Sequence, residues 1–446
     1  MVKTFRIGGV HPPQNKLSAG KKIETLALPK QAVFPLSQHI GAPAVAMVKR
    51  GDEVKVGTQI AQAGGFVSAA IFSSVSGKVA KIDNVYDASG FRKPAIIINV
   101  DGDEWEPTID RSTDLIQKCD FSAEQIIEKV KAAGMVGMGG ACFPTHVKLS
   151  PPPGFVAEIL IINAVECEPY LTADHQLMLE KAPEIMVGVS LLMKAIHVNK
   201  AVIAIENNKP DAIELMSKVA EDFLGIEVLP LQVKYPQGGE KQLIDAVLDR
   251  QVAAPPALPI SEGAVVQNVG TAFAVYEAVQ KNKPLFERVV TVTGKLLPHP
   301  SNFLVRMGTP ISQLIEAAGG MPEDTSKIIG GGPMMGKALV SAEIPICKGS
   351  SGVLLMGDAE AHRNEVQNCI RCGKCVGICP MGLEPYLLGA LFEQSNWERL
   401  EKEEIMSCIE CGSCQFTCPS NRPLLEYCRI GKVTVGGKIR ARNAKK

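Results

Sequence analysis

The chain has 446 residues, of which 46% are hydrophobic and 21% are charged, and its 47 basic side chains balance its 47 acidic ones. This composition is typical of a globular protein with several folded domains and excludes a disordered chain. The balanced charge gives no sign of the basic surface that nucleic-acid-binding proteins need, so we expect no nucleic-acid partner.

No stretch of the sequence has the roughly 18 consecutive apolar residues that a membrane-spanning helix needs. The start, Met1–Lys16, also lacks the apolar core of a secretory signal. Eight of the 13 cysteines fall in two closely spaced runs, and the other five are Cys119, Cys142, Cys167, Cys347 and Cys428. An odd remainder without a signal predicts free thiols in a reducing cytoplasm rather than a disulfide framework.

The first 110 residues are predicted to form an irregular N-terminal segment and a small β domain. From Val33 to Val100, short β-branched runs are separated by glycines. The segment Val48–Gly57 and the later Ser76–Val79 resemble the V-x-x-G-D-x-V-x-x-G and S-G-x-V motifs of biotinyl/lipoyl half-barrels. Those domains carry their group on a hairpin lysine, and the matching stretch Phe66–Phe72 has none. We therefore predict a structural half-barrel and not a carrier.

Residues 111–285 alternate between helical and strand patterns, which predicts an α/β domain with a largely parallel sheet. The expected helices are Ala123–Ala133, Ala182–His197, Asp211–Phe223, Gly239–Leu248 and Thr271–Gln280. The expected strands are Glu158–Ala164, Ala201–Glu206 and Ile226–Val233.

A glycine-rich loop, Gly134–Lys148, follows the first of these helices. Glycines let backbone N–H groups approach a phosphate or a planar ring, and Lys148 can add a positive charge. The dinucleotide motif of Rossmann folds is not met, because Cys142 stands where the third glycine is required and no strand leads into the loop. A flexible loop without a ligand is the alternative.

Three polar clusters follow the loop along the chain, and ligands of open α/β sheets bind at the carboxyl ends of the strands. Taken singly, each cluster is better explained as a helix N-cap or a surface turn. The clusters are Asn163–Tyr170, Gly238–Lys241 and Gln267–Thr271.

Residues 286–358 return to a β pattern with a strand at Val289–Thr293 and one helix at Ile311–Ala318. The segment Gly331–Ala338 nearly matches a P-loop. It has Ala338 where magnesium binding needs Ser or Thr, and Pro333 removes one N–H group. We predict a tight turn here and no ATP site.

The two cysteine runs define a helical domain over residues 359–430. Each has the C-x₂-C-x₂-C-x₃-C-P spacing of two-cluster ferredoxins, in which the fourth cysteine of one run binds the cluster of the other. This predicts two [4Fe–4S] centres with the ligand sets Cys369, Cys372, Cys375 and Cys418, and Cys408, Cys411, Cys414 and Cys379. Zinc knuckles or disulfides are the alternatives, but zinc sites usually pair two C-x₂-C arms.

Helices at Glu384–Phe392 and Trp397–Met406 are expected to separate the two runs. Residues 431–446 form a tail that is basic from Lys438 onward. We expect a solvated end, and a membrane-surface or partner contact is the alternative.

Taken in order, the polar clusters resemble the flavin- and NADH-binding subunit of respiratory complex I. That family has G-x-G-G-A-G-F-P-T-x-x-K, N-A-D-E-x-E-P, G-E-E and N-N-V-E-T segments. The matching residues here are Gly137–Lys148, Asn163–Pro169, Gly239-Glu240 and Asn268–Thr271. The whole order of parts, which starts with G-G-x-H-P-P at Gly8–Pro13, more closely resembles the RnfC family, the C subunits of Rnf ferredoxin:NAD⁺ oxidoreductase complexes.

The resemblance implies a multidomain protein with a half-barrel, an FMN- and NADH-binding α/β domain, a β-grasp domain and a two-cluster ferredoxin domain. FMN would be held by Gly137, Gly139, Lys148, Asn163, Glu166, Asn268 and Thr271. The dinucleotide NAD(H) would face Gly140, Phe143 and Glu168, and Glu240 belongs to the same cofactor-binding set.

The same resemblance implies a peripheral subunit on the cytoplasmic face of the inner membrane, bound to the other subunits of the complex, including its iron–sulfur subunit. No side-chain acid or base is expected for hydride transfer. Three positions depart from the complex I pattern, namely Cys142, Val165 and Gly270. Two alternatives stay open: a related cobalamin reductase of propanediol-utilisation compartments, and a non-catalytic iron–sulfur adaptor that has lost its flavin.

Overall fold

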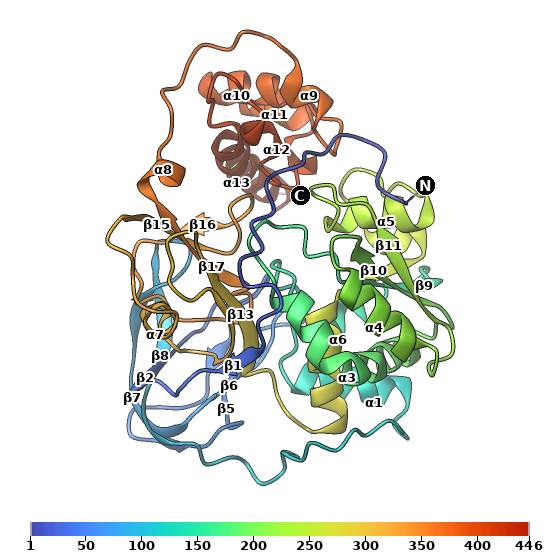
Figure 1. Ribbon diagram of the computed structural model, residues 1–446, viewed down its shortest axis with the longest axis vertical. Coiled ribbons are helices and arrows are strands. Elements are labelled where there is room, and N and C mark those ends of the chain that lie inside the picture. Colours follow the sequence, from blue (N-terminus) through green and yellow to red (C-terminus); the bar gives the residue numbers. More distant parts are fainter. Residues whose placement is uncertain (1, 445–446) are drawn as a thin grey trace.

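The computed structural model describes residues 2–444, which form two β domains, an α/β domain and a helical domain. In Figure 1 the helical domain lies at the top, the α/β domain at the right and the two β domains at the lower left. The multidomain α/β and β architecture expected from the sequence is confirmed. Within residues 2–444, no helix is both long and apolar enough to cross a membrane.

The half-barrel consists of two small sheets with a shared apolar core. One sheet has the order β2-β8-β7-β4 and the other β3-β5-β6. Ile96 and Ile98 of β8 point to the same face and belong to this core, and the alternate residues Ala95 and Ile97 are buried as well. The strands are β2 (Gln31–Pro35), β3 (Val45–Ala46), β4 (Glu53–Val54), β5 (Gln59–Gln62), β6 (Ile71–Phe72), β7 (Ser76–Tyr86) and β8 (Arg92–Gly102).

The α/β domain contains a four-stranded parallel sheet with the order β11-β10-β9-β12. Leu160 and Ile162 of β9 pack toward α3, α4 and α6, whereas Ile159 and Ile161 pack toward α5. The sheet is therefore covered on both faces, as parallel sheets require. The strands are β9 (Ile159–Asn163), β10 (Ala201–Glu206), β11 (Ile226–Leu231) and β12 (Ala264–Asn268).

The helices of this domain largely match the sequence patterns. α3 starts nine residues earlier than expected and has a kink at Lys181, just before Pro183. The strand β12 was not expected, because its short apolar run follows a proline-rich loop and leads directly into α6. The helices are α1 (Ala123–Ala132), α2 (Thr145–Lys148), α3 (Ala173–Ala195), α4 (Pro210–Ala220), α5 (Glu240–Leu248), η1 (Pro259–Glu262) and α6 (Val269–Gln280).

The second β domain, which we call the β-grasp domain, is a mixed six-stranded sheet with the order β1-β14-β13-β17-β15-β16. The helix α7 (Ile311–Ala317) packs on it, and β1 comes from the N-terminal segment. The strands are β1 (Ile23–Thr25), β13 (Glu287–Thr293), β14 (Ser301–Arg306), β15 (Thr325–Gly330), β16 (Lys337–Ala338) and β17 (Gly352–Gly357).

The helical domain repeats one local structure at both cysteine runs. Gly373 and Gly412 adopt positive φ angles just before the short helices α9 and α12. The last helix, α13, continues to Asn443 and includes most of residues 431–446, the segment expected as a basic tail. The end expected to be solvated, from Lys438 onward, is exposed up to residue 444 except for the partly buried Ile439, and residues 445–446 lie outside the described part of the chain. The helices are α8 (Asp358–Ala361), α9 (Lys374–Gly377), α10 (Pro385–Glu393), α11 (Trp397–Lys402), η2 (Ile405–Ser407), α12 (Ser413–Phe416) and α13 (Leu424–Asn443).

The N-terminal segment runs between the α/β and helical domains, as the dark blue trace in Figure 1 shows. Val10 forms an antiparallel bridge with Tyr235, and the Gly9 N–H donates to the Ile378 carbonyl at 2.9 Å. A Cβ atom on Gly8 would lie 2.5 Å from the same Ile378 carbonyl oxygen. This close packing connects the two domains through the G-G-x-H-P-P segment.

Candidate cofactor sites

The glycine-rich loop is a closed turn beside the carboxyl edge of the parallel sheet. The Gly137 N–H donates to the Phe143 carbonyl at 2.8 Å, which closes the base of the loop. The tip is exposed at Gly139 and Gly140, and a Cβ atom on Gly140 would meet no atom within 4 Å. The loop thus presents backbone to open space, as a ligand cradle requires.

The loop is attached to the start of α6, where β12 ends. The Met138 N–H donates to the Thr271 hydroxyl at 2.9 Å. A Cβ atom on Gly139 would lie 3.3 Å from the Asn268 Cβ. Asn268 also caps α6, because its side chain accepts from the Thr271 N–H. These residues, predicted from two separate clusters, are brought together.

Lys148 points toward the same edge from α2. Its ammonium group donates to the Glu240 carboxylate at 2.5 Å and to the Val266 carbonyl at 3.1 Å. Glu240 is the first residue of α5, so a negative charge there is stabilised by the helix dipole. Both side chains are only partly buried, so the pair can open to admit an anionic group.

The turn that follows β9 carries the remaining predicted residues. The Asn163 side-chain amide donates to the Gly238 carbonyl at 2.8 Å, which joins the first and second polar clusters. Glu166 has a positive φ angle, and its carboxylate accepts from the backbone N–H groups of Asp174 and His175 at 2.9 and 3.2 Å. Glu166 therefore caps α3.

Asp174, which the sequence did not single out, joins this network. Its carboxylate accepts from the Asn268 side-chain amide at 2.7 Å. Burial, together with the nearby negative charge of Glu166, raises the pKa of Asp174 to about 7. Asp174 thus links the cap of α3 to the glycine loop.

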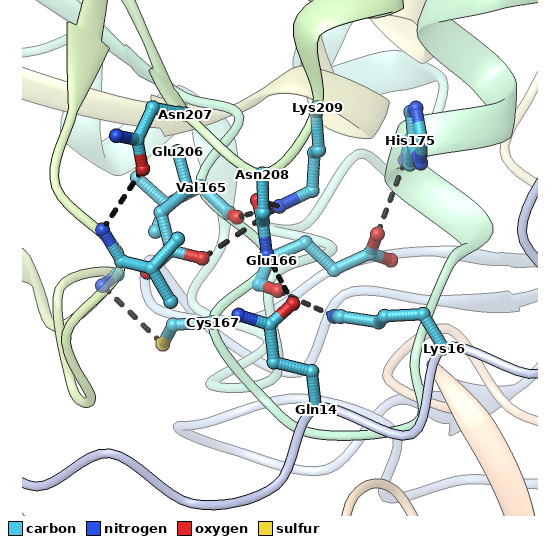
Figure 2. Close-up of polar contacts among 12 residues, drawn as sticks. Gln14, Lys16, Val165, Glu166, Cys167, His175, Glu206, Asn207, Asn208 and Lys209 are labelled. Atoms are coloured by element: carbon cyan, nitrogen blue, oxygen red, sulfur yellow. Dashed lines mark hydrogen bonds and ion pairs between the residues drawn. The ribbon is translucent and has the colours of Figure 1, made fainter.

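Two lysines hold the turn after β9 by its carbonyl groups, as Figure 2 shows. Lys16 donates to the carbonyls of Glu166, Glu168 and Leu171 at 2.9, 2.9 and 2.7 Å. Lys209 donates to the Val165 carbonyl at 2.7 Å and pairs with Glu206 at 3.7 Å. A buried ammonium is unfavourable without such partners, so these contacts fix the shape of the turn.

Glu168 lies at the end of this turn and faces the β-grasp domain. Its carboxylate accepts from the backbone N–H groups of Met334 and Met335 at 3.1 and 2.7 Å. A Cβ atom on Gly332 would lie 2.2 Å from a Glu168 carboxylate oxygen, so a larger residue there would displace the Glu168 side chain. The near-P-loop is a turn, as predicted, and two of its N–H groups bind Glu168. Burial raises the pKa of Glu168 to about 7.

The eight motif cysteines gather into the two sets that the sequence predicts. Each set takes three thiols from one run and the fourth from the other, and lines one cavity. One cavity is lined by Cys369, Cys372, Cys375 and Cys418, and the other by Cys379, Cys408, Cys411 and Cys414. Across residues 2–444, no three Cys, His, Asp or Glu side chains are arranged to hold a single metal ion.

The two cysteine sets differ in exposure. In the first set Cys369 and Cys372 are exposed, whereas in the second set Cys379 and Cys411 are buried. We call them the exposed set and the buried set. Cys428 also lines the buried cavity, and its hydrogen bond to Cys408 lowers the pKa of the Cys408 thiol to about 7.

The buried set lies directly against the α/β domain. The Tyr235 hydroxyl donates to the Cys411 carbonyl at 2.8 Å. The Gln242 side-chain amide donates to the Pro380 carbonyl at 3.1 Å. Gln242 and Glu240 lie in the same first turn of α5, so this turn touches both the buried set and Lys148. The two candidate sites are neighbours.

Sequence reasoning missed Lys16, Lys209, Tyr235 and Asp174. Glu206 ends a buried strand just as Asn163 does, so the same rule could have pointed to the Glu206–Lys209 pair. Lys16 and Tyr235 lie in irregular segments with no local pattern. The backbone carbonyls that accept their hydrogen bonds lie 150 or more positions away along the chain, so only the tertiary structure reveals these contacts.

Comparison with known families supports this architecture. Residues 130–277 match the family model described as the Nuo51 FMN-binding domain. Residues 3–103 match the RnfC barrel sandwich hybrid domain, and residues 289–338 match the SLBB domain. Fold and site together define an oxidoreductase subunit with an FMN-binding domain of the Nuo51 type.

Curated relatives make the assignment more specific. The chain is 45% identical over 406 residues to the C subunit of the proton-translocating ferredoxin:NAD(+) oxidoreductase complex of Clostridium ljungdahlii, covering 90% of this chain and 87% of that protein. It is 42% identical over 437 residues to the C subunit of the Na(+)-translocating complex of Acetobacterium woodii, covering 96% of each. The C subunit of the ion-translocating oxidoreductase complex of Rhodobacter capsulatus is 41% identical, with 100% and 85% covered. The chain therefore belongs to the RnfC family.

Proposed function

We propose that this chain exchanges hydride with NAD(H) at a bound FMN and passes single electrons through two [4Fe–4S] centres. One observation carries this proposal: each set of four thiols is complete, and the buried set touches the same turn of α5 that pairs with Lys148. FMN, when bound, supplies the ability to exchange two electrons with a nicotinamide and one with a cluster.

The residues at the sheet edge fit a flavin mononucleotide. Gly137 and Gly139 offer backbone without side-chain obstruction, and Lys148 would neutralise the phosphate. Gln267, the residue before Asn268, has a buried side-chain nitrogen with no hydrogen-bond partner among residues 2–444. We assign Asn163, Glu166, Asn268 and Thr271 to the surroundings of the ring and phosphate, with Glu240 releasing Lys148 when the phosphate arrives.

The dinucleotide would approach from the open tip of the loop. Gly140 leaves room there, and the half-buried Phe143 ring can stack on a planar group. We include Glu168 among the residues that face NAD(H). Its carboxylate already accepts from the Met334 and Met335 N–H groups, so only its remaining lone pairs would be available to NAD(H).

The two cysteine sets suggest an order of electron transfer. The buried set lies beside the proposed flavin site and the exposed set lies farther out, with Ile370 68% exposed beside it. An exposed cluster with apolar neighbours is suited to contact with another redox protein. We propose that the exposed set exchanges electrons with an iron–sulfur subunit of the complex, and that the chain is peripheral on the cytoplasmic face of the membrane.

One experiment tests the core of this proposal. The chain is purified without oxygen, reconstituted with iron, sulfide and FMN, and mixed with NADH. We expect about eight irons per chain and bleaching of the flavin absorbance. Failure of the reconstituted chain to retain FMN would contradict NADH oxidation and favour the adaptor alternative. Reduction of cobalamin by the reduced chain, without any co-purifying membrane subunits, would favour the cobalamin reductase.

A further inference from the structure

Tyr235 lies where three domains and the N-terminal segment meet. It follows β11, and only 2% of its surface is exposed. It packs with Val10 of the N-terminal segment, Met334 of the β-grasp turn and Cys411 of the buried set. A tyrosine buried among apolar groups needs a partner for its hydroxyl, and the partner reveals the role of the residue.

The hydroxyl group of Tyr235 has two acceptors within reach. The Cys411 carbonyl lies at 2.8 Å and a Glu168 carboxylate oxygen at 3.4 Å. The shorter distance identifies the Cys411 carbonyl as the main acceptor. Cys411 is a member of the buried set, so Tyr235 fixes the backbone of a proposed cluster ligand.

The β-grasp turn holds this arrangement from the other side. A Cβ atom on Gly412 would lie 2.7 Å from the Met334 carbonyl, so the turn presses directly on the residue after Cys411. The Arg429 guanidinium donates to the Met335 carbonyl at 2.7 Å. With Glu168 bound to the N–H groups of the same turn, the Cys411 loop is confined by groups from three domains.

We propose that Tyr235 is a positioning residue that raises the reduction potential of the buried [4Fe–4S] centre through its hydrogen bond to the Cys411 carbonyl. The inference rests on the proposed function, because it requires a cluster at the buried set. Reduction adds negative charge to a cluster, and hydrogen bonds around it favour the reduced form. Without the hydroxyl, the carbonyl dipole beside the cluster is uncompensated and reduction becomes less favourable.

The test compares the full chain with its Tyr235→Phe variant, both reconstituted without oxygen. Redox titrations followed by electron paramagnetic resonance give the potentials of both centres. We expect Tyr235→Phe to keep its iron and to lower one potential while the other stays unchanged. Reduction of that centre by NADH should slow, while the flavin bleaches at the wild-type rate.

Tyr386→Phe is the matched control, because Tyr386 lines the cavity of the exposed set. It should leave the potential that Tyr235→Phe lowers unchanged. If Tyr235→Phe loses iron, Gly332→Ala provides the second test, because its Cβ displaces Glu168 and the β-grasp turn that presses on the Cys411 loop. This variant should shift the potential of one centre and leave the potential of the other unchanged.

Two failures are distinguishable. A wild-type chain with about four irons would overturn the two-cluster proposal together with this inference. If the wild type has two clusters and both potentials are unchanged in Tyr235→Phe, the inference alone is overturned. Where Tyr235→Phe loses iron, unchanged potentials in Gly332→Ala overturn it in the same way.

Discussion

At the scale of single residues, the sequence locates polar groups better than it identifies their partners. Glu166 and Glu168 follow a buried strand, which correctly places them at the carboxyl edge of the sheet. The structure uses Glu166 to cap α3 and Glu168 to hold the β-grasp turn. A carboxylate satisfies any nearby N–H donor, and which donor is near depends on chain segments far away in sequence.

Lys148 provides the first prediction at this scale. Lys148→Gln should weaken FMN binding roughly 10- to 100-fold, because a hydrogen bond to a charged group contributes about 1.5–3 kcal/mol. Flavin retention on gel filtration and fluorescence titration with FMN measure the change. Lys131→Gln, on the exposed face of α1, is the control and should bind FMN normally. Equal affinity in both variants would show that Lys148 does not meet the phosphate.

Cys428 provides the second prediction. It lines the buried cavity, but Cys379, Cys408, Cys411 and Cys414 already supply four thiols there. Cys428→Ser should therefore keep about eight irons per chain, whereas Cys414→Ser should keep about four. Iron and sulfide analysis of the reconstituted chains decides between them. A loss of four irons in Cys428→Ser would make Cys428 a ligand.

At the scale of elements, periodic patterns predicted most helices and strands, and context decided the rest. The strand β12 is short and follows a proline-rich loop, so its identity depends on pairing with β9. The segment expected as a basic tail, residues 431–446, continues α13 up to Asn443, and its end from Lys438 onward is exposed, as expected, except for the partly buried Ile439. Although this segment is mostly polar, one face of it is buried. That face includes Gly431 and Val435, which pack toward α11 and η2.

Two valines of α13 provide a matched test. Val435 is 1% exposed and Val433 is 73% exposed. Val435→Ala should destabilise the helical domain by roughly 1–3 kcal/mol, because it removes buried methyl groups and leaves a cavity. Val433→Ala should change stability very little. Denaturant unfolding followed by the cluster absorbance measures both. Equal small effects would contradict a packing role for Val435.

At the scale of the whole molecule, buried lysines connect the domains. Lys348, in the β-grasp domain, is fully buried. It donates to the Ala70 carbonyl of the half-barrel at 2.5 Å and to the Gly134 carbonyl before the glycine loop at 2.6 Å. Burial lowers the pKa of Lys348 to about 7, well below its usual value of 10.5.

This shift predicts the pH dependence of domain assembly. Between pH 7 and 10.5 the unfolded chain binds a proton at Lys348 that the folded chain has released. Folded stability should therefore rise with pH in this window, by up to about 1.4 kcal/mol per pH unit. Thermal unfolding of Lys348→Met should lack this part of the rise, and Lys337→Met, on exposed β16, should keep it. An identical slope in all three chains would contradict the assignment.

The sequence by itself determined the local structure and the chemistry that spacing encodes. Cysteine spacing predicted which four thiols form each set, since a rigid local turn fixes the first three and the proline directs the fourth away. Glycine and strand patterns predicted the loop and the sheet edge. Only the tertiary structure decided how these parts meet, because Lys16, Tyr235 and Lys348 act on backbone groups 150 or more positions away. Such contacts leave no local pattern, since any carbonyl can accept them.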